Sequence, residues 1–127
     1  MFAEAFRVAS SFTRPVVIST RRLNNEVGSA VGSFIVLNAD GWVMTAGHIV
    51  NPIGSQLEEV GKIKRKLADR NAIMAGSEPD GFKRAMVKKL NLPNNALTHV
   101  SPWWGQNGAQ IEQVLIDPLG DLAVCRL

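Results

Sequence analysis

The chain has 127 residues and a mass of 13.8 kDa, a length that allows one domain. Hydrophobic residues make up 46% and charged residues 20%, so a packed core is affordable and wholesale disorder is excluded. The formal net charge of +3 is too small to indicate a dedicated nucleic-acid protein. One cysteine excludes an internal disulfide and a cysteine-based zinc site, and two histidines leave little scope for a histidine-rich metal site.

The sequence contains no apolar run of about 18 residues, so we expect no membrane-spanning helix. Glu4 and Arg7 interrupt the apolar character of the first residues, which argues against a secretory signal. Together with the single cysteine, Cys125, this favours a cytoplasmic location.

The first fifty residues predict one helix and three strands. Apolar residues at helical spacing from Phe2 to Ala9 indicate a short amphipathic helix, which Pro15 ends. Segments rich in β-branched residues predict strands over 15–20, 30–37 and 42–45. The turn signal at 38–41 joins the second and third strands into a hairpin.

Residues 54–95 have helical periodicity and predict an insertion of two helices. Leu57, Val60, Ile63 and Leu67 mark an amphipathic helix, and a second one is expected to begin near Asp80. The basic residues of this segment are mixed with acidic ones, which favours a solvated helix face and no nucleic-acid partner.

Residues 96–127 return to strand character. We expect strands over 96–103, 109–116 and 122–127, with a turn at 117–120 before the last. Of the paired tryptophans at 103 and 104, one is expected in the core and one over a seam. The chain stops inside an apolar strand, which we interpret as a cut end.

Two short segments carry groups suited to chemistry. In residues 41–50 a strand delivers His48 into a corner of small residues, Ala46 and Gly47. In residues 117–124, Asp121 stands immediately before an apolar strand. A carboxylate at that place can accept a hydrogen bond from a histidine N–H and fix its tautomer.

The segments Gly32-Ser-Phe-Ile-Val, Asp40-Gly-Trp-Val-Met-Thr-Ala-Gly-His48 and Asp117-Pro-Leu-Gly-Asp-Leu-Ala-Val124 resemble the N-terminal barrel of trypsin-like serine proteases, most closely the bacterial HtrA-type branch. The resemblance implies a mainly β fold with a helical insertion at 54–95, in a six-stranded antiparallel Greek-key barrel. It also implies that His48 is the general base and Asp121 the acid that orients it, in the histidine-before-aspartate order of chymotrypsin-type enzymes. It implies no metal and no cofactor.

The family's serine loop and second barrel have no counterpart in the chain. Eight serines are present, none in a Gly-Asp-Ser-Gly-Gly-like context: Ser10, Ser11, Ser19, Ser29, Ser33, Ser55, Ser77 and Ser101. We therefore interpret residues 1–127 as the first barrel of a serine endopeptidase that acts on polypeptides, inactive without the missing C-terminal barrel. The barrel face left uncovered is expected to be apolar and to favour self-association.

Structural alternatives accompany each candidate. His48 can be a strand-end capping residue, Asp121 a strand cap, and Asp117 is interpreted as a turn residue. We expect a structural role for His99, and for Cys125 the role of a small core residue. The competing function is a non-catalytic binding or assembly module on a protease-like barrel, with the basic helical insertion as its contact surface. A small nucleic-acid binder using the same basic helices is a third hypothesis.

Overall fold

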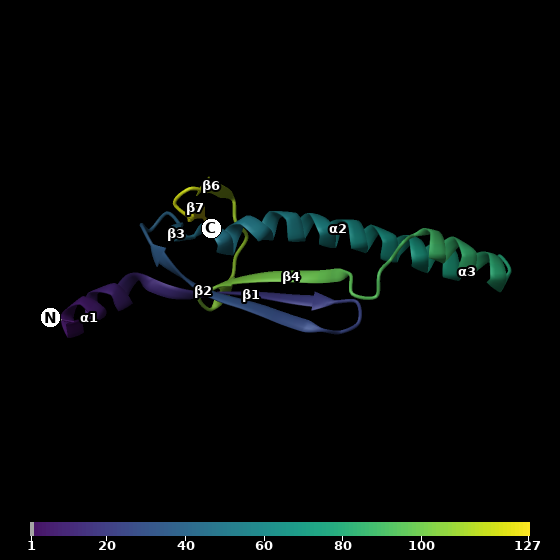
Figure 1. The fold of residues 1–127 in the computed structure, drawn as a ribbon, viewed down its shortest axis with the longest axis horizontal. Coiled ribbons are helices and arrows are strands. Elements are labelled where there is room, and N and C mark those ends of the chain that lie inside the picture. Colours follow the sequence, from purple (N-terminus) through teal and green to yellow (C-terminus); the bar gives the residue numbers. More distant parts are fainter. Residues whose placement is uncertain (1) are drawn as a thin grey trace.

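The computed structural model describes residues 2–127 and has a mixed α/β architecture. Its elements are α1 (Phe2–Phe12), β1 (Thr13–Arg22), β2 (Val27–Val36), β3 (Trp42–Ala46), α2 (Gly47–Ala75), α3 (Asp80–Lys89), β4 (Leu97–Trp104), β5 (Asn107–Gly108), β6 (Gln113–Asp117) and β7 (Leu122–Arg126). The seven strands form one sheet in the order β5-β4-β1-β2-β3-β7-β6, with every pair antiparallel. The long helix α2 runs along this sheet, and α1 projects from one end (Figure 1).

Both expected hairpins near the site are confirmed. β2 pairs with β3, with Phe34 opposite Thr45, and β6 pairs with β7. The turn between β6 and β7 is held by Asp117, whose Oδ1 accepts a hydrogen bond of 3.0 Å from the backbone N–H of Leu119. Asp117 is therefore the turn residue that the sequence indicates.

The three helices and the antiparallel strands expected from the sequence are present, but the helices hold about as many residues as the strands, so the fold is mixed α/β rather than mainly β. The sheet has seven strands rather than six, and β5 and β6 are its two edges, so it does not close into a barrel. Part of the reason lies in α2, which contacts β4 on one half of the sheet and β3, β6 and β7 on the other. The helix thus lies over the face that a closed barrel would use as its interior.

The helical segment also begins earlier than expected, at Gly47 rather than at Gly54. The sequence Asn51-Pro52 suggests a break, yet Pro52 lies inside α2. A proline in the second turn removes one backbone hydrogen bond, a loss that a packed helix can absorb. Here the buried residues supply that packing, since they continue along one face from the first turn onward: Gly47, Val50, Ile53, Val60 and Ile63.

The core lies between α2 and the central strands. Its members are small or aromatic: Val16, Phe34, Val43, Val50, Trp104, Ala123 and Cys125. Trp104 is buried and meets Phe34 edge to face, with ring centroids 5.3 Å apart. Trp103 is 45% exposed, so the tryptophan pair divides between core and surface, and Cys125 is the small core residue expected from the sequence.

The outward face of the sheet is partly apolar. Val31 on β2 is 69% exposed, and its cross-strand neighbour on β1 is Val17, which in turn lies opposite Trp103 on β4. These three residues share one face because directly paired residues in an antiparallel sheet point the same way. Within residues 2–127, no helix has the length and apolar character that a membrane span needs.

Candidate functional site: a histidine–aspartate pair at the start of α2

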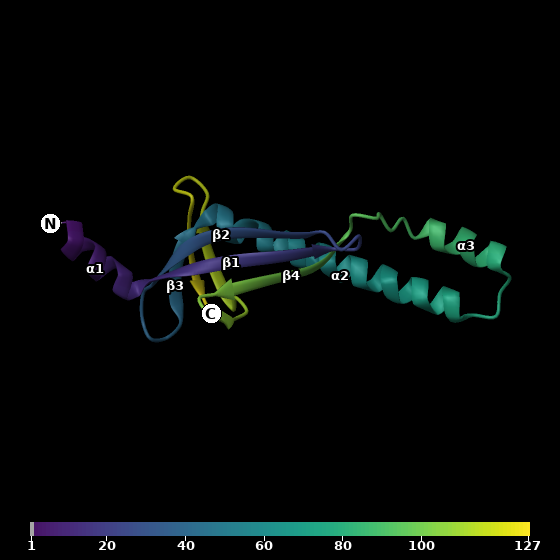
Figure 2. The same ribbon diagram turned by 90° about the horizontal axis from the view of Figure 1, so that it is seen from below.

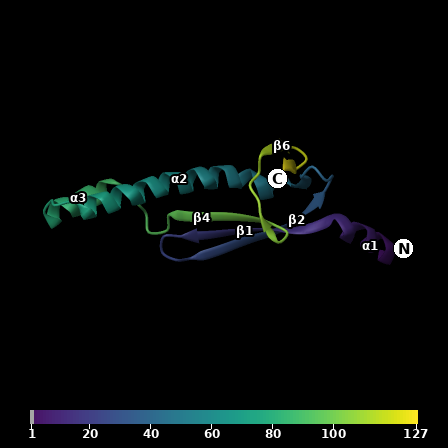
Figure 3. The ribbon, with the colours of Figure 1, turned by 180° about the vertical axis from the view of Figure 1, so that it is seen from behind.

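Strand pairing brings His48 and Asp121 together. β3 ends at Ala46, and α2 begins at the next residue, so His48 lies in the first turn of the helix. Ala46 pairs with Leu122 at the start of β7, which sets Asp121 beside that turn. Figure 3 shows the β6–β7 segment next to the beginning of α2. Two residues 73 positions apart thereby become neighbours.

The side chains are in direct contact. His48 Nδ1 lies 2.6 Å from Asp121 Oδ2, a short distance for a hydrogen bond that involves a carboxylate. A charged carboxylate only accepts hydrogen bonds, so this contact places a proton on Nδ1. In the neutral ring the other nitrogen, Nε2, is then the basic atom. The two side chains are 69% and 54% exposed, so this nitrogen belongs to a largely solvent-exposed ring.

Asp121 also caps the helix. The first residues of an α-helix have backbone N–H groups without partners, and Ala46 supplies no side-chain cap. Asp121 Oδ1 accepts the N–H of His48 at 2.7 Å, and its backbone carbonyl accepts the N–H of Gly47 at 2.8 Å. Asp121 therefore caps the helix with Oδ1 and its backbone carbonyl, and contacts the imidazole with Oδ2.

These hydrogen bonds lower the pKa of Asp121 below its ordinary value. The side-chain bond from His48 is the main cause, and the bond from the His48 backbone N–H acts in the same direction. The backbone of Asp121 is left-handed, with φ of 50°, a conformation that aspartate adopts more readily than most residues. The carboxylate is thus held ionised in a fixed orientation.

Gly47 makes the close approach possible. A Cβ at this position would lie 3.1 Å from Asp121 Oδ1 and 3.2 Å from the Asp121 carbonyl carbon. Both contacts are tighter than most side chains make, so a larger residue would force the helix and the β7 backbone slightly apart. The sequence predicts a corner of small residues at Ala46 and Gly47, and the structure shows that Gly47 packs closely against Asp121.

A hollow of about 310 Å³ adjoins His48 on the side of β1 and β2. The helix contributes residues on one face, at i, i+4 and i+8: His48, Pro52 and Gln56. Ile49 adds to this wall, and the strands supply the remainder: Ile18, Thr20, Ser29 and Ala30. Sequence reasoning missed this hollow, because it started the helix after Pro52. The helical spacing from His48 to Gln56 was the available signal.

The other candidate residues lie elsewhere. Cys125 is fully buried, and burial raises the pKa of its thiol, which makes it a poor nucleophile. His99 is exposed on β4, and its Nδ1 lies 3.0 Å from Oγ1 of the adjacent Thr98. Among the residues described, 2–127, no hydroxyl group is hydrogen-bonded to the imidazole of His48, and no group of three potential metal ligands occurs.

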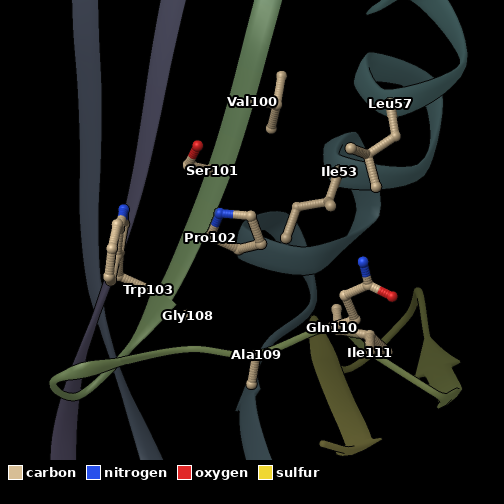
Figure 4. A pocket seen from close by; sticks show the side chains of 10 residues that line it. All are labelled: Ile53, Leu57, Val100, Ser101, Pro102, Trp103, Gly108, Ala109, Gln110 and Ile111. Atoms are coloured by element: carbon tan, nitrogen blue, oxygen red, sulfur yellow. The ribbon is translucent and has the colours of Figure 1, made fainter. Parts of the chain in front are cut away.

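A second hollow of about 490 Å³ lies between α2 and β4 (Figure 4). Ile53 and Leu57 reach into it from the helix, Val100 and Pro102 face it from the strand, and Ile111 lies below. Its lining includes no acidic, basic or histidine side chain. This hollow therefore supplies no side chain for acid–base chemistry.

The fold and site define an α/β protein with a histidine–aspartate pair at a strand-to-helix junction. Comparison with family models, with curated proteins and with solved structures gives no significant match. The assignment of a function consequently depends on the geometry of this site and on the sequence motifs around it.

Proposed function

We propose that this chain supplies the general base and its orienting acid for a serine-protease type of acyl transfer. The supporting observation is the 2.6 Å contact between His48 Nδ1 and Asp121 Oδ2, which directs Nε2 away from the carboxylate as the proton acceptor. In that role Nε2 takes the proton of a serine hydroxyl as it attacks a peptide carbonyl, then returns it to the leaving amine. Asp121 holds the tautomer and stabilises the imidazolium.

The strand order supports our proposal that the fold is related to the barrel of trypsin-like proteases. The order β4-β1-β2-β3 is a Greek key, in which the fourth strand returns to lie beside the first. Pairing of β6 with β4 would close the sheet into the six-stranded barrel of trypsin-like proteases, with α2 and α3 as the helical insertion. We therefore propose an opened form of that barrel, with the serine and the oxyanion-binding amides on a partner domain.

A fluorophosphonate probe tests the proposal on the complete natural gene product, because the probe labels only serines activated by a base. We expect labelling in the natural protein and its loss in His48→Ala. We expect no peptide hydrolysis by residues 1–127 alone. Labelling that persists unchanged in His48→Ala would exclude His48 as the base.

Asp121→Asn separates catalysis from helix capping. The asparagine carbonyl can still accept the N–H of His48, but its NH₂ group faces Nδ1 and forces the proton onto Nε2. We expect the rate of fluorophosphonate labelling to fall by about 10⁴-fold, which is the effect of the wrong histidine tautomer in such triads. The free energy of unfolding should change little. A rate within about tenfold of the parent would contradict the assigned role of the carboxylate.

The second candidate is a binding or assembly module without chemistry. It is favoured by the capping bonds of Asp121, which give the pair a structural purpose, and by the apolar outward face around Val31 and Trp103. This alternative predicts that the natural gene product is not labelled by the probe. It also predicts concentration-dependent self-association that Val31→Asp reduces, measured by light scattering.

A further inference from the structure

The positive charge of the chain is concentrated in the helical arm, which we define as residues 62–89. The arm holds nine lysines and arginines against three acidic residues, a net charge of +6. The whole chain has a net charge of +3, so the remainder carries −3. The mixed signs that the sequence suggested for the insertion come partly from Glu58 and Glu59, which precede the arm. Charge is thus separated in space along the molecule.

The arm extends beyond the sheet. The first half of α2 lies along β4, whereas its second half and α3 continue past the ends of the strands as a helical hairpin (Figure 2). Lys66 Nζ donates to the backbone carbonyl of Asn91 at 3.2 Å, and Lys83 Nζ to that of Met74, so two lysines tie the hairpin together. The hairpin is therefore a projecting element that solvent reaches from several sides.

Most of the arm's cations have no acidic partner within residues 2–127. The ion pair in this region joins Lys62 to Glu58, at 2.9 Å. Five exposed cations make no ion pair and no hydrogen bond with protein groups in the part of the chain described: Lys64, Arg65, Arg84, Lys88 and Lys89. Self-repulsion among them weakens the arm, and neutralisation by a bound polyanion would relieve it.

The cations of the arm lie on several sides of its helices, and this arrangement suits some polyanions better than others. Consecutive helical residues are about 100° apart, so Lys64, Arg65 and Lys66 point to different sides of α2. A flat membrane surface or one face of a folded protein meets only part of such a set, whereas a flexible strand of phosphates can follow it. Phe82, 51% exposed beside Lys83 and Arg84, offers a ring on which a base can stack. Glu78 and Asp80 at the hairpin tip would oppose insertion of Phe82 into anionic lipid.

We propose that the helical arm binds single-stranded nucleic acid through its phosphates, without sequence preference. The site is at the end of α2 opposite to His48, so the proposal is independent of the protease function. Release of counterions makes such binding strongly salt-dependent, with log K falling by about 0.7 for each single-strand phosphate neutralised.

The test is fluorescence anisotropy of a labelled oligothymidylate about twenty nucleotides long, titrated with the 127-residue chain at several salt concentrations. We expect Arg65→Gln with Arg84→Gln to weaken binding about 25-fold at about 0.1 M salt and to lower the salt slope by about 1.4. The control, Arg7→Gln with Arg21→Gln, removes the same charge from the body. We expect it to change affinity by less than about twofold.

Circular dichroism verifies that each variant is folded, and Lys64→Gln with Lys88→Gln is a second arm pair should the first not fold. Equal weakening by the arm and body pairs would overturn the proposal, because net charge alone would explain the binding. So would the absence of binding at about 50 mM salt, or an affinity that does not change with salt. Binding to phosphatidylserine vesicles in place of the oligonucleotide would assign the arm to membranes instead.

Discussion

Replacing Gly47 by alanine tests how closely α2 packs against the strand that carries Asp121. The added Cβ would lie 3.1 Å from Asp121 Oδ1, 3.2 Å from the Asp121 carbonyl carbon and 3.3 Å from the Leu122 nitrogen. The carboxylate can rotate away, but the two backbone atoms belong to a segment fixed by pairing with β3. Relief therefore requires movement of the helix end away from β7.

The size of the effect follows from two opposing contributions. Forcing an extra methyl group into a packed site costs about 1–3 kcal/mol, while alanine gains up to about 1 kcal/mol over glycine in a helix. We expect Gly47→Ala to destabilise the fold by about 1–2 kcal/mol and to lengthen the contact between His48 and Asp121. Gly54→Ala is the matched control in the same helix, since a Cβ there meets nothing within 4 Å. It should stabilise the protein by up to about 1 kcal/mol.

Urea denaturation measures both free energies of unfolding, and the proton resonance of His48 Nδ1 reports the hydrogen bond to Asp121. In Gly47→Ala this resonance should shift or broaden, and in Gly54→Ala it should not. If Gly47→Ala is as stable as Gly54→Ala and leaves the resonance unchanged, the close approach of α2 to β7 is not as described.

Three further predictions concern the core, the ionised carboxylate and the buried thiol. Ile53→Ala should lower the free energy of unfolding by about 2–5 kcal/mol in urea titrations, and Leu57→Ala, at a half-exposed position, by clearly less. Because His48 lowers the pKa of Asp121, the stability that this carboxylate adds is complete above the unfolded pKa of about 3.9 and is lost as pH falls through the folded value. The difference in melting temperature between the parent and Asp121→Ala should therefore be larger near neutral pH than at pH values below the folded pKa, and a constant difference would contradict the shift. Burial raises the pKa of the Cys125 thiol, so Ellman's reagent should react with it only in denaturant, and rapid reaction in the native state would refute its place in the core.

The strands near the site could be predicted from the sequence, because their signals are local. Runs of β-branched residues predicted β1, β2 and β3, and the turn signal at 117–120 predicted the hairpin of β6 and β7. His48 and Asp121 were predicted as partners from two motifs, and strand pairing places them in contact. The local sequence therefore contains enough information to locate both members of the pair.

The start of α2 and the closure of the sheet could not be predicted in the same way. Asn51-Pro52 carries a local signal for a break, but the helix is stabilised by tertiary packing of Val50 and Ile53 on the sheet, which outweighs one lost backbone bond. Whether β6 pairs with β4 depends on what fills the space between them. In this structure α2 contacts both halves of the sheet. These contacts join residues far apart in the chain, so no local segment of the sequence predicts them.

The helix α2 separates the two proposed activities while making both possible. Its first turn uses Asp121 as a cap and so orients the imidazole, and its far half carries the cations of the arm. At 1.5 Å per residue the stretch of α2 from His48 to Lys62, where the arm begins, spans about 21 Å, more than twice the screening length of about 8 Å at physiological salt. The charge of the arm is therefore largely screened from the site at His48. Neutralising Arg65 and Arg84 should leave fluorophosphonate labelling unchanged, and His48→Ala should leave oligonucleotide binding unchanged. Each proposal can thus fail without affecting the other.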